Sequence, residues 1–118
     1  MKFSLLVAMA LFTTFSYSKD QTMKHSLKDK IKLSDTSKTV KVLTQASYKL
    51  IGLGFKKDQV LEKHKTPTPA VLIVQSGSVD FKMSDNTYHL KAGDYFEIPA
   101  DVEHEVVGKE DSYLYLVK

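Results

Sequence analysis

HKTPTPAVLIVQSG, residues 64–77, carries the strongest structural signal in this chain. It begins with a histidine, continues through two prolines into the apolar run Ala70–Val74, and ends at a glycine. Because proline has a fixed φ and no amide hydrogen, Pro67 and Pro69 exclude a helix here and allow a strand to begin directly after them. The run is apolar at every position, so the strand needs cover on both of its faces.

A second stretch, GDYFEIPADVEH at residues 93–104, has a related organisation. A turn glycine leads into a short strand, which ends at a proline just before another histidine. Side chains alternate across a strand, so His64 and Thr66 share one face of the first segment. On the later strand His104 shares its face with Val102 and Val106. If these faces point inward, the two histidines approach each other from different strands.

Further strand-like segments lie on both sides of these two. They are short, follow one another every 8 to 12 residues and are separated by glycine or Asp-Asn turn signals, as in a sandwich or barrel. We expect Gly52 and Gly54 to mark a bulge or bend in one strand. The predicted strands are residues 39–44, 48–55, 59–65, 70–74, 78–83, 87–90, 95–98, 103–107 and 113–117.

Together the two stretches resemble the paired motifs of the cupin family. The first cupin motif has two histidines, a glutamate and a glycine, and the second has a glycine, a proline, a glycine, a histidine and an asparagine. The matching positions here are His64, Thr66, Ala70 and Gly77, followed by Gly93, Pro99, Asp101, His104 and Gly108. The resemblance extends from about residue 39 to the end. It implies a single-domain, all-β fold, the antiparallel double-stranded β-helix or jelly-roll barrel.

In cupins the motif histidines and the glutamate usually ligate one divalent metal. This chain keeps only His64 and His104, since Thr66 is a poor ligand and Ala70 is none, whereas tight sites generally need three or four ligands. Three interpretations remain open. The pair could hold Fe, Mn, Ni, Cu or Zn weakly, completed by water or a chelating substrate. A metal-free pocket of His64, Thr66 and His104 could bind a small molecule or transfer protons. The pair could also be hydrogen-bonded core histidines.

Other polar side chains are weaker candidates. Glu62 shares the alternation of His64 and could replace the missing carboxylate. His25 and His89 are expected at the surface, with His89 opposite a core-facing Leu90. Asp101 is expected to be a turn residue.

The function expected from this resemblance is binding of a small organic acid or sugar, with the metal as an optional partner. Cupin enzymes suggest dioxygenase, isomerase or lyase chemistry, and no residue selects among them, so catalysis is left open. The alternative is a non-catalytic ligand-binding or structural barrel that has lost the metal. Outward-facing Val71 and Ile73 need cover from the N-terminal segment or from another subunit, and we expect a homodimer.

Composition and the N-terminal sequence set the remaining expectations. A basic start, an apolar run and small residues predict a signal peptide over residues 1–18, with export to the periplasm or medium and no membrane anchor after cleavage. Residues 19–38 form a flexible polar leader, and residues 39–118 form the barrel. The 17 basic residues are all lysine, which argues against nucleic-acid binding. Without cysteine the chain has no disulfide or thiolate site.

Overall fold

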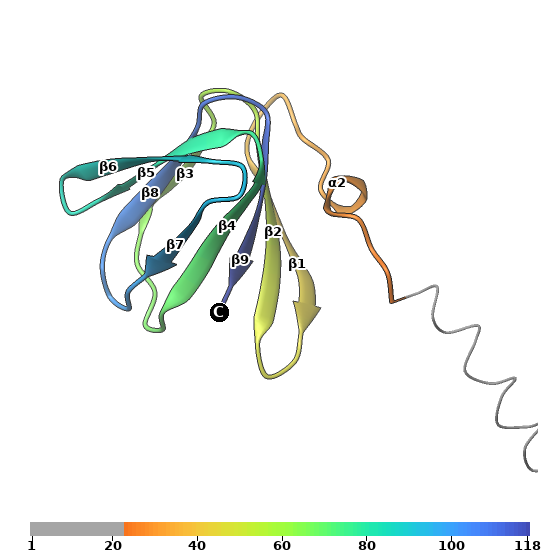
Figure 1. The fold of residues 1–118 in the computed structure, drawn as a ribbon, viewed down its shortest axis with the longest axis horizontal. Coiled ribbons are helices and arrows are strands. Elements are labelled where there is room, and N and C mark those ends of the chain that lie inside the picture. Colours follow the sequence, from red (N-terminus) through yellow and green to blue (C-terminus); the bar gives the residue numbers. More distant parts are fainter. Residues whose placement is uncertain (1–22) are drawn as a thin grey trace, which may run out of the picture.

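The computed structural model describes residues 23–118, and the predicted signal peptide lies outside them. Two antiparallel sheets face each other (Figure 1). Sheet A has the strand order β1 (Thr39–Gln45), β2 (Lys49–Phe55), β9 (Ser112–Val117), β4 (Ala70–Ser76) and β7 (Tyr95–Ile98). Sheet B has the order β3 (Val60–His64), β8 (His104–Gly108), β5 (Ser78–Met83) and β6 (Asn86–Lys91).

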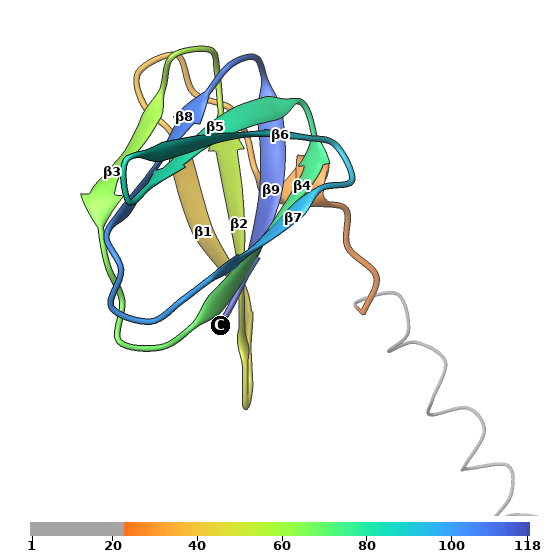
Figure 2. The same cartoon turned by 60° about the vertical axis from the view of Figure 1, so that its left-hand side comes forward.

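This arrangement confirms the predicted all-β jelly-roll fold. Each of the nine predicted strands overlaps one of these elements. Figure 2 shows β5 and β6 crossing steeply over the strands of sheet A, so that the two sheets close around one interior. In the described part of the chain, no helix has the length and hydropathy that a membrane crossing requires.

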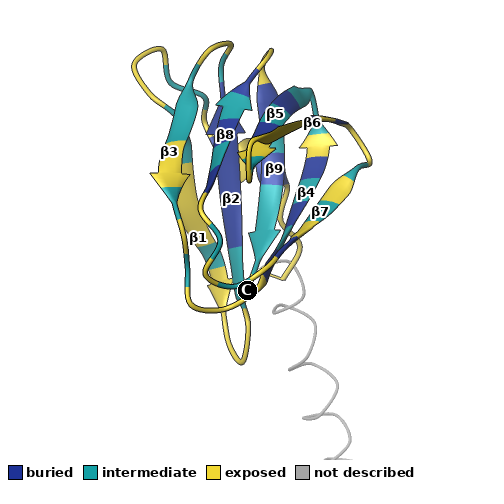
Figure 3. Cartoon of the chain, turned by 90° about the vertical axis from the view of Figure 1, so that its left-hand side faces the viewer, coloured by how far each residue is buried: buried dark blue, intermediate teal, exposed yellow. Residues whose placement is uncertain are grey.

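The interior is filled by alternate side chains of both sheets. In β4 the pattern is regular, with Ala70, Leu72 and Val74 buried and Val71 and Ile73 half-buried on the outer face, as the sequence predicts. The buried strand residues, dark blue in Figure 3, form one apolar cluster. Its members are Ile51, Leu53, Phe55, Ala70, Leu72, Val74, Val79, Phe81, Leu90, Ile98, Val106 and Leu114.

Two tight turns explain two of the motif residues. Gly77, between β4 and β5, has φ +86°, and Gly93, before β7, has φ +93°. Glycine adopts this left-handed backbone without strain. At Gly77 a side chain is excluded twice, because a Cβ there would also collide with the backbone carbonyl of Asp111 and with the hydroxyl of Ser112.

The outer face of sheet A is partly covered by the segment that precedes β1. Helix α2 (Leu27–Lys30) lies outside this sheet in Figure 1, and Ile31 just after it is 0% exposed. A Cβ on Gly52 would lie 2.8 Å from Ile31 Cδ1, and one on Gly54 would lie 2.6 Å from Ile31 Cγ2. The expectation of a bulge at these glycines is wrong, since both pair in regular register with β9. They are glycines because an apolar segment packs directly on the strand.

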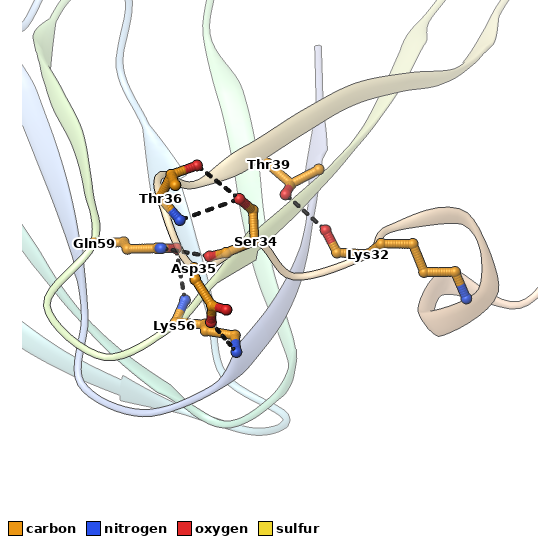
Figure 4. Close-up of polar contacts among 7 residues, drawn as sticks. All are labelled: Lys32, Ser34, Asp35, Thr36, Thr39, Lys56 and Gln59. Carbon is orange, nitrogen blue, oxygen red and sulfur yellow. Dashed lines mark hydrogen bonds and ion pairs between the residues drawn. The ribbon is translucent and has the colours of Figure 1, made fainter.

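Polar contacts fix the end of the same segment (Figure 4). The Thr39 hydroxyl donates to the carbonyl of Lys32 at 2.8 Å, and the Gln59 side-chain amide donates to the carbonyl of Ser34 at 2.6 Å. Lys56 forms an ion pair with Asp35 at 2.6 Å. The sequence predicts a flexible leader over residues 19–38. Within it, Leu27 and Ile31 are instead buried, because the two glycines of β2 leave an apolar surface for them.

Candidate functional site

A β-bulge sets the geometry of the candidate site. Strand β3 pairs with β8, with Leu61 opposite Val106 and His64 opposite His104. Three residue steps along β3 therefore match two steps along β8, so one extra residue lies in β3. The bulge leaves both Glu62 and Lys63 exposed while His64 is half-buried.

This bulge overturns the hypothesis that Glu62 replaces the missing carboxylate. Strict alternation would put Glu62 on the same face as His64, but the extra residue breaks that alternation. The Glu62 side chain is 73% exposed and forms an ion pair with Lys38 at 2.9 Å. The hydrogen bond from Lys38 holds the pKa of Glu62 below its usual value. Glu62 is thus part of a surface ion pair.

The structure brings the two motif histidines together. The ring centroids of His64 and His104 are 4.4 Å apart, with the planes inclined at 59°. His104 is 5% exposed and stacks on Phe81, with a centroid distance of 5.5 Å and an interplanar angle of 22°. Phe81 is itself fully buried. The more deeply buried imidazole thus rests on the core, and the half-buried one lies beside it at the rim.

Both imidazoles are oriented by their own strands. Nδ1 of His64 lies 2.8 Å from the carbonyl oxygen of Glu62, and Nδ1 of His104 lies 3.0 Å from that of Val102. A carbonyl only accepts hydrogen bonds, so in the neutral rings Nδ1 carries the hydrogen and Nε2 keeps its lone pair. Neither Nε2 has a hydrogen-bond partner among the described residues. Every buried side-chain nitrogen among these residues has a hydrogen-bond partner. Nε2 of His104 has none, so this atom is not buried and solvent reaches it.

Burial lowers the pKa of His104 below its ordinary value. The desolvation of the charged ring is the main cause, the hydrogen bond to Val102 acts in the opposite direction, and the neighbouring His64 lowers the pKa further. The ring is therefore neutral at neutral pH. It can accept a hydrogen bond or a proton through Nε2.

The two histidines lie at the open end of the barrel. Met83, at the end of β5, pairs with His104 of the neighbouring strand β8. On the facing sheet, Ala70 pairs with Ile98. The loops from β3 to β4 and from β7 to β8 both lie at this end (Figure 3). They are joined by a hydrogen bond of 2.7 Å from the Asp101 amide to the carbonyl of Thr66.

Asp101, one of the weaker candidates, and Thr66, a predicted pocket residue, both make backbone contacts in the loops at this end. Asp101 has φ +61°, the left-handed conformation that the motif glycine would favour, so it is a turn residue as expected. The Thr66 hydroxyl donates to the carbonyl of Thr68 at 3.0 Å, which occupies its hydrogen. His89 is exposed on the outer face of β6, with its Nδ1 2.6 Å from Asp80, and His25 is also exposed.

Two cavities flank Met83 at this end. One of about 550 Å³ is mainly apolar and is lined by Pro69, Ala70, Val71, Met83, Glu97, Ile98, Pro99 and Val117. The other, of about 400 Å³, carries charges of both signs and is lined by Lys63, Lys82, Met83, Ser84, Asp85, Asn86, Thr87, Val102, Glu103 and Glu105. Both volumes fall within the range of small-molecule sites. The histidine rings do not line either cavity, and Met83 is the residue that links both cavities to His104.

The donor set does not fit a resident metal ion. Within residues 23–118, no group of three or more His, Cys, Asp or Glu side chains is placed to hold one. The two imidazoles have the tautomer that a metal requires, because their Nδ1 atoms are bound to carbonyl groups. Two ligands still fall short of the three or four in stable protein sites.

Comparison with known proteins agrees with this fold. The family described as "Cupin domain" matches residues 54–117, which is more than half of the chain. The chain belongs to the cupin family. Among curated proteins, none matches this cupin significantly in sequence.

Solved structures support the same architecture. A cupin-2 domain containing protein from Shewanella frigidimarina has a TM-score of 0.70 and 24% identity, covering 83% of this chain and 96% of that chain. A conserved protein of unknown function from Streptococcus pyogenes has a TM-score of 0.72 and 20% identity, covering 80% and 83%. An uncharacterised double-stranded β-helix protein from Klebsiella pneumoniae has a TM-score of 0.71 and 16% identity, covering 80% and 86%. At these identities the similarity concerns the fold.

Sequence reasoning identified the histidine pair but missed the residues around it. Phe81 stacks under His104, and Met83 lies opposite that ring. They lie two and four residues after the core-facing Val79 and share its face of β5, so their inward orientation could have been predicted. Their contact with His104 depends on the pairing of β5 with β8, which no local pattern specifies.

Proposed function

We propose that this cupin binds a small molecule at the open end of its barrel, with His64 and His104 as the polar contacts. The observation that carries the proposal is the pairing of two imidazoles whose Nδ1 atoms are fixed by backbone carbonyls while both Nε2 atoms stay free. Such a pair presents two acceptors to the hydroxyl or N–H groups of a ligand. The 550 Å³ cavity beside Met83 offers the adjoining apolar surface.

NMR of the two rings tests this proposal directly. Protein with ¹⁵N-labelled histidine would be titrated with D-glucose, citrate, phenol and cyclohexanol, each to millimolar concentration. We expect at least one compound to shift the Nε2 signals of His64 and His104 while the exposed His25 and His89 stay unchanged. If the protein is instead a structural barrel, which is the alternative function, no compound should shift the NMR signals of any of the four histidines.

A second candidate function is ligand-dependent binding of a divalent transition metal. The free Nε2 atoms of the facing rings favour it, although the donor set is incomplete. Untagged protein dialysed against Zn²⁺ or Ni²⁺ and measured by elemental analysis would decide. Substoichiometric binding that falls on lowering the pH and disappears in His104→Gln, but persists in His89→Gln, would support this candidate. Equal metal content in both variants would dismiss it.

We further propose that the protein is exported and forms a homodimer. Export is supported by the sequence of residues 1–18, and amino-terminal sequencing of exported protein should begin at Lys19. The dimer is supported by the outer face of β4 and β7, where Val71 and Ile73 are only half-buried and Tyr95 is 64% exposed. Light scattering should give twice the chain mass. Ile73→Lys should halve that value, and Lys82→Glu on the opposite sheet should not.

A further inference from the structure

We infer that the ligand of this site is an uncharged, mainly apolar molecule that carries a hydrogen-bond donor, such as an alcohol or a phenol. The inference rests on the proposed function and narrows it, because it excludes the anions that an organic acid or a phosphorylated sugar would present. Three separate observations support it. They are the apolar lining of the larger cavity, the negative charge of the smaller cavity and the lack of a free N–H donor on His104.

The larger cavity is unsuited to an anion. Seven of its eight lining residues are apolar, and the eighth, Glu97, is a carboxylate. No lysine lines it. A carboxylate placed there would lose part of its hydration and face a like charge without a compensating cation, which is unfavourable. An apolar skeleton would instead be stabilised by about 25 cal/mol for each Å² of surface removed from water.

The smaller cavity does not supply the missing cation. Lys63 and Lys82 line it, but so do the three carboxylates of Asp85, Glu103 and Glu105. Its formal charge is therefore negative. An anion that extended past Met83 from the apolar cavity would still meet net repulsion.

The polar contacts at the site select for a donor. His104 is neutral at neutral pH and has its only hydrogen on Nδ1, which is bound to the carbonyl of Val102. Its Nε2 can therefore accept but not donate. A hydroxyl or N–H group of the ligand can donate a hydrogen bond to this Nε2, whereas a carboxylate has no hydrogen to donate. Met83, opposite His104 in the sheet and lining the larger cavity, places the apolar and polar contacts side by side.

Two pairs of probes with matched skeletons test the inference: cyclohexanol against cyclohexanecarboxylate, and phenol against benzoate. Affinities would be measured at neutral pH by calorimetry and by the methyl signals of Met83 and Ile98. We expect the neutral member of each pair to bind at least tenfold more tightly. His64→Phe, which removes one acceptor, should weaken cyclohexanol binding about fivefold, the effect of one lost hydrogen bond.

A charge reversal at the lining provides the matched variant. Glu97→Lys introduces a cation into the cavity wall and should raise the affinity for cyclohexanecarboxylate at least fivefold. Glu110→Lys makes the same change of charge in the turn before β9, at a residue that lines neither cavity, and should leave that affinity unchanged.

The outcomes separate the two proposals. Tighter binding of the carboxylates by the unmodified protein would overturn the inference while the ligand site itself stands. If none of these probes binds and the histidine signals also ignore glucose and citrate, both the inference and the proposed function fail.

Discussion

His104 is the residue in which the core and the candidate site meet. Its ring stacks on the buried Phe81 and also lies beside the ring of His64 at the rim. Burial gives the ring a fixed position and a lowered pKa, while its free Nε2 remains available to a ligand. The protonation of this ring is thus tied to its packing, and the proposed ligand contact would be tied to both.

The lowered pKa of His104 predicts that the protein is less stable in mild acid. In the unfolded chain the ring takes up a proton near its ordinary pKa of about 6.5, whereas the folded protein resists protonation. The free energy of unfolding should therefore be highest above that pH, fall as the pH drops through it, and level off below the folded pKa.

Urea unfolding at a series of pH values measures this dependence. His104→Phe removes the titrating group and keeps the stacking on Phe81, so its stability should change less with pH between neutral and mildly acidic conditions. The exposed His25 provides a control, and His25→Gln should retain the full dependence. An unchanged dependence in His104→Phe would show that other groups control the acid response.

Gly54 lets the segment before β1 pack closely on β2. Its φ is not in the left-handed region, so alanine suits the backbone, but the new Cβ would lie 2.6 Å from Ile31 Cγ2 and 2.7 Å from Leu33 Cδ2. Gly54→Ala should lower the free energy of unfolding by about 1–3 kcal/mol through overpacking. In an Ile31→Ala, Leu33→Ala background the same change should be neutral or stabilising, as measured by urea unfolding. Equal effects in both backgrounds would contradict this packing.

At the scale of elements, strand pairing and turn contacts determine what each segment contributes. Ser112, the first residue of β9, is fully buried. Its hydroxyl accepts a hydrogen bond from the Ser78 amide at 3.0 Å and donates to the backbone, with carbonyls of Ser78 and Glu110 within 3.0 Å. One side chain thus links the turn after β4 to the turn before β9.

Ser112→Ala should therefore destabilise the protein by about 1–3 kcal/mol, because the half-buried Ser78 amide loses its partner. Thermal or urea unfolding would measure the loss. Ser37→Ala, whose hydroxyl makes only an exposed 3.3 Å contact with Lys38, should stay within about 0.5 kcal/mol of the parent. A loss as large in Ser37→Ala would mean that hydroxyl removal itself is responsible.

The strands could be predicted from the sequence, and their exact registers could not. Alternation located β4 and β8, and glycine with proline located their ends, because these signals are local. The bulge in β3 depends on which residues of β8 lie opposite, so Glu62 was misplaced by a rule that is otherwise sound. The space that Gly52 and Gly54 leave for Ile31 was missed for the same reason, since Ile31 meets them only in the folded chain.

At the scale of the whole molecule, the segment before β1 is part of the barrel wall. Leu27 and Ile31 are buried on the outer face of sheet A, opposite the side that faces the interior (Figure 1). The family match begins only at residue 54, so this cover lies outside the matched region. Stability therefore depends on residues that the shared barrel does not include.

A truncation tests this dependence. A chain that begins at Ser34 should be less stable than one that begins at Met23 by about 3–6 kcal/mol, because burial of each large aliphatic side chain contributes about 1.5–3 kcal/mol. That loss is comparable with the entire stability of many small domains. Comparable urea midpoints for the two chains would show that the segment adds no stability.

The extra residue in β3 also constrains how this protein can diverge. Three residue steps separate Leu61 from His64, and without the bulge strict alternation over three steps would turn the imidazole toward water. A strand one residue shorter in this interval would bring the histidine opposite His104 by simple alternation. Homologues that keep both histidines should therefore be compared by whether a bulge accompanies the longer interval before they are assigned the same binding site.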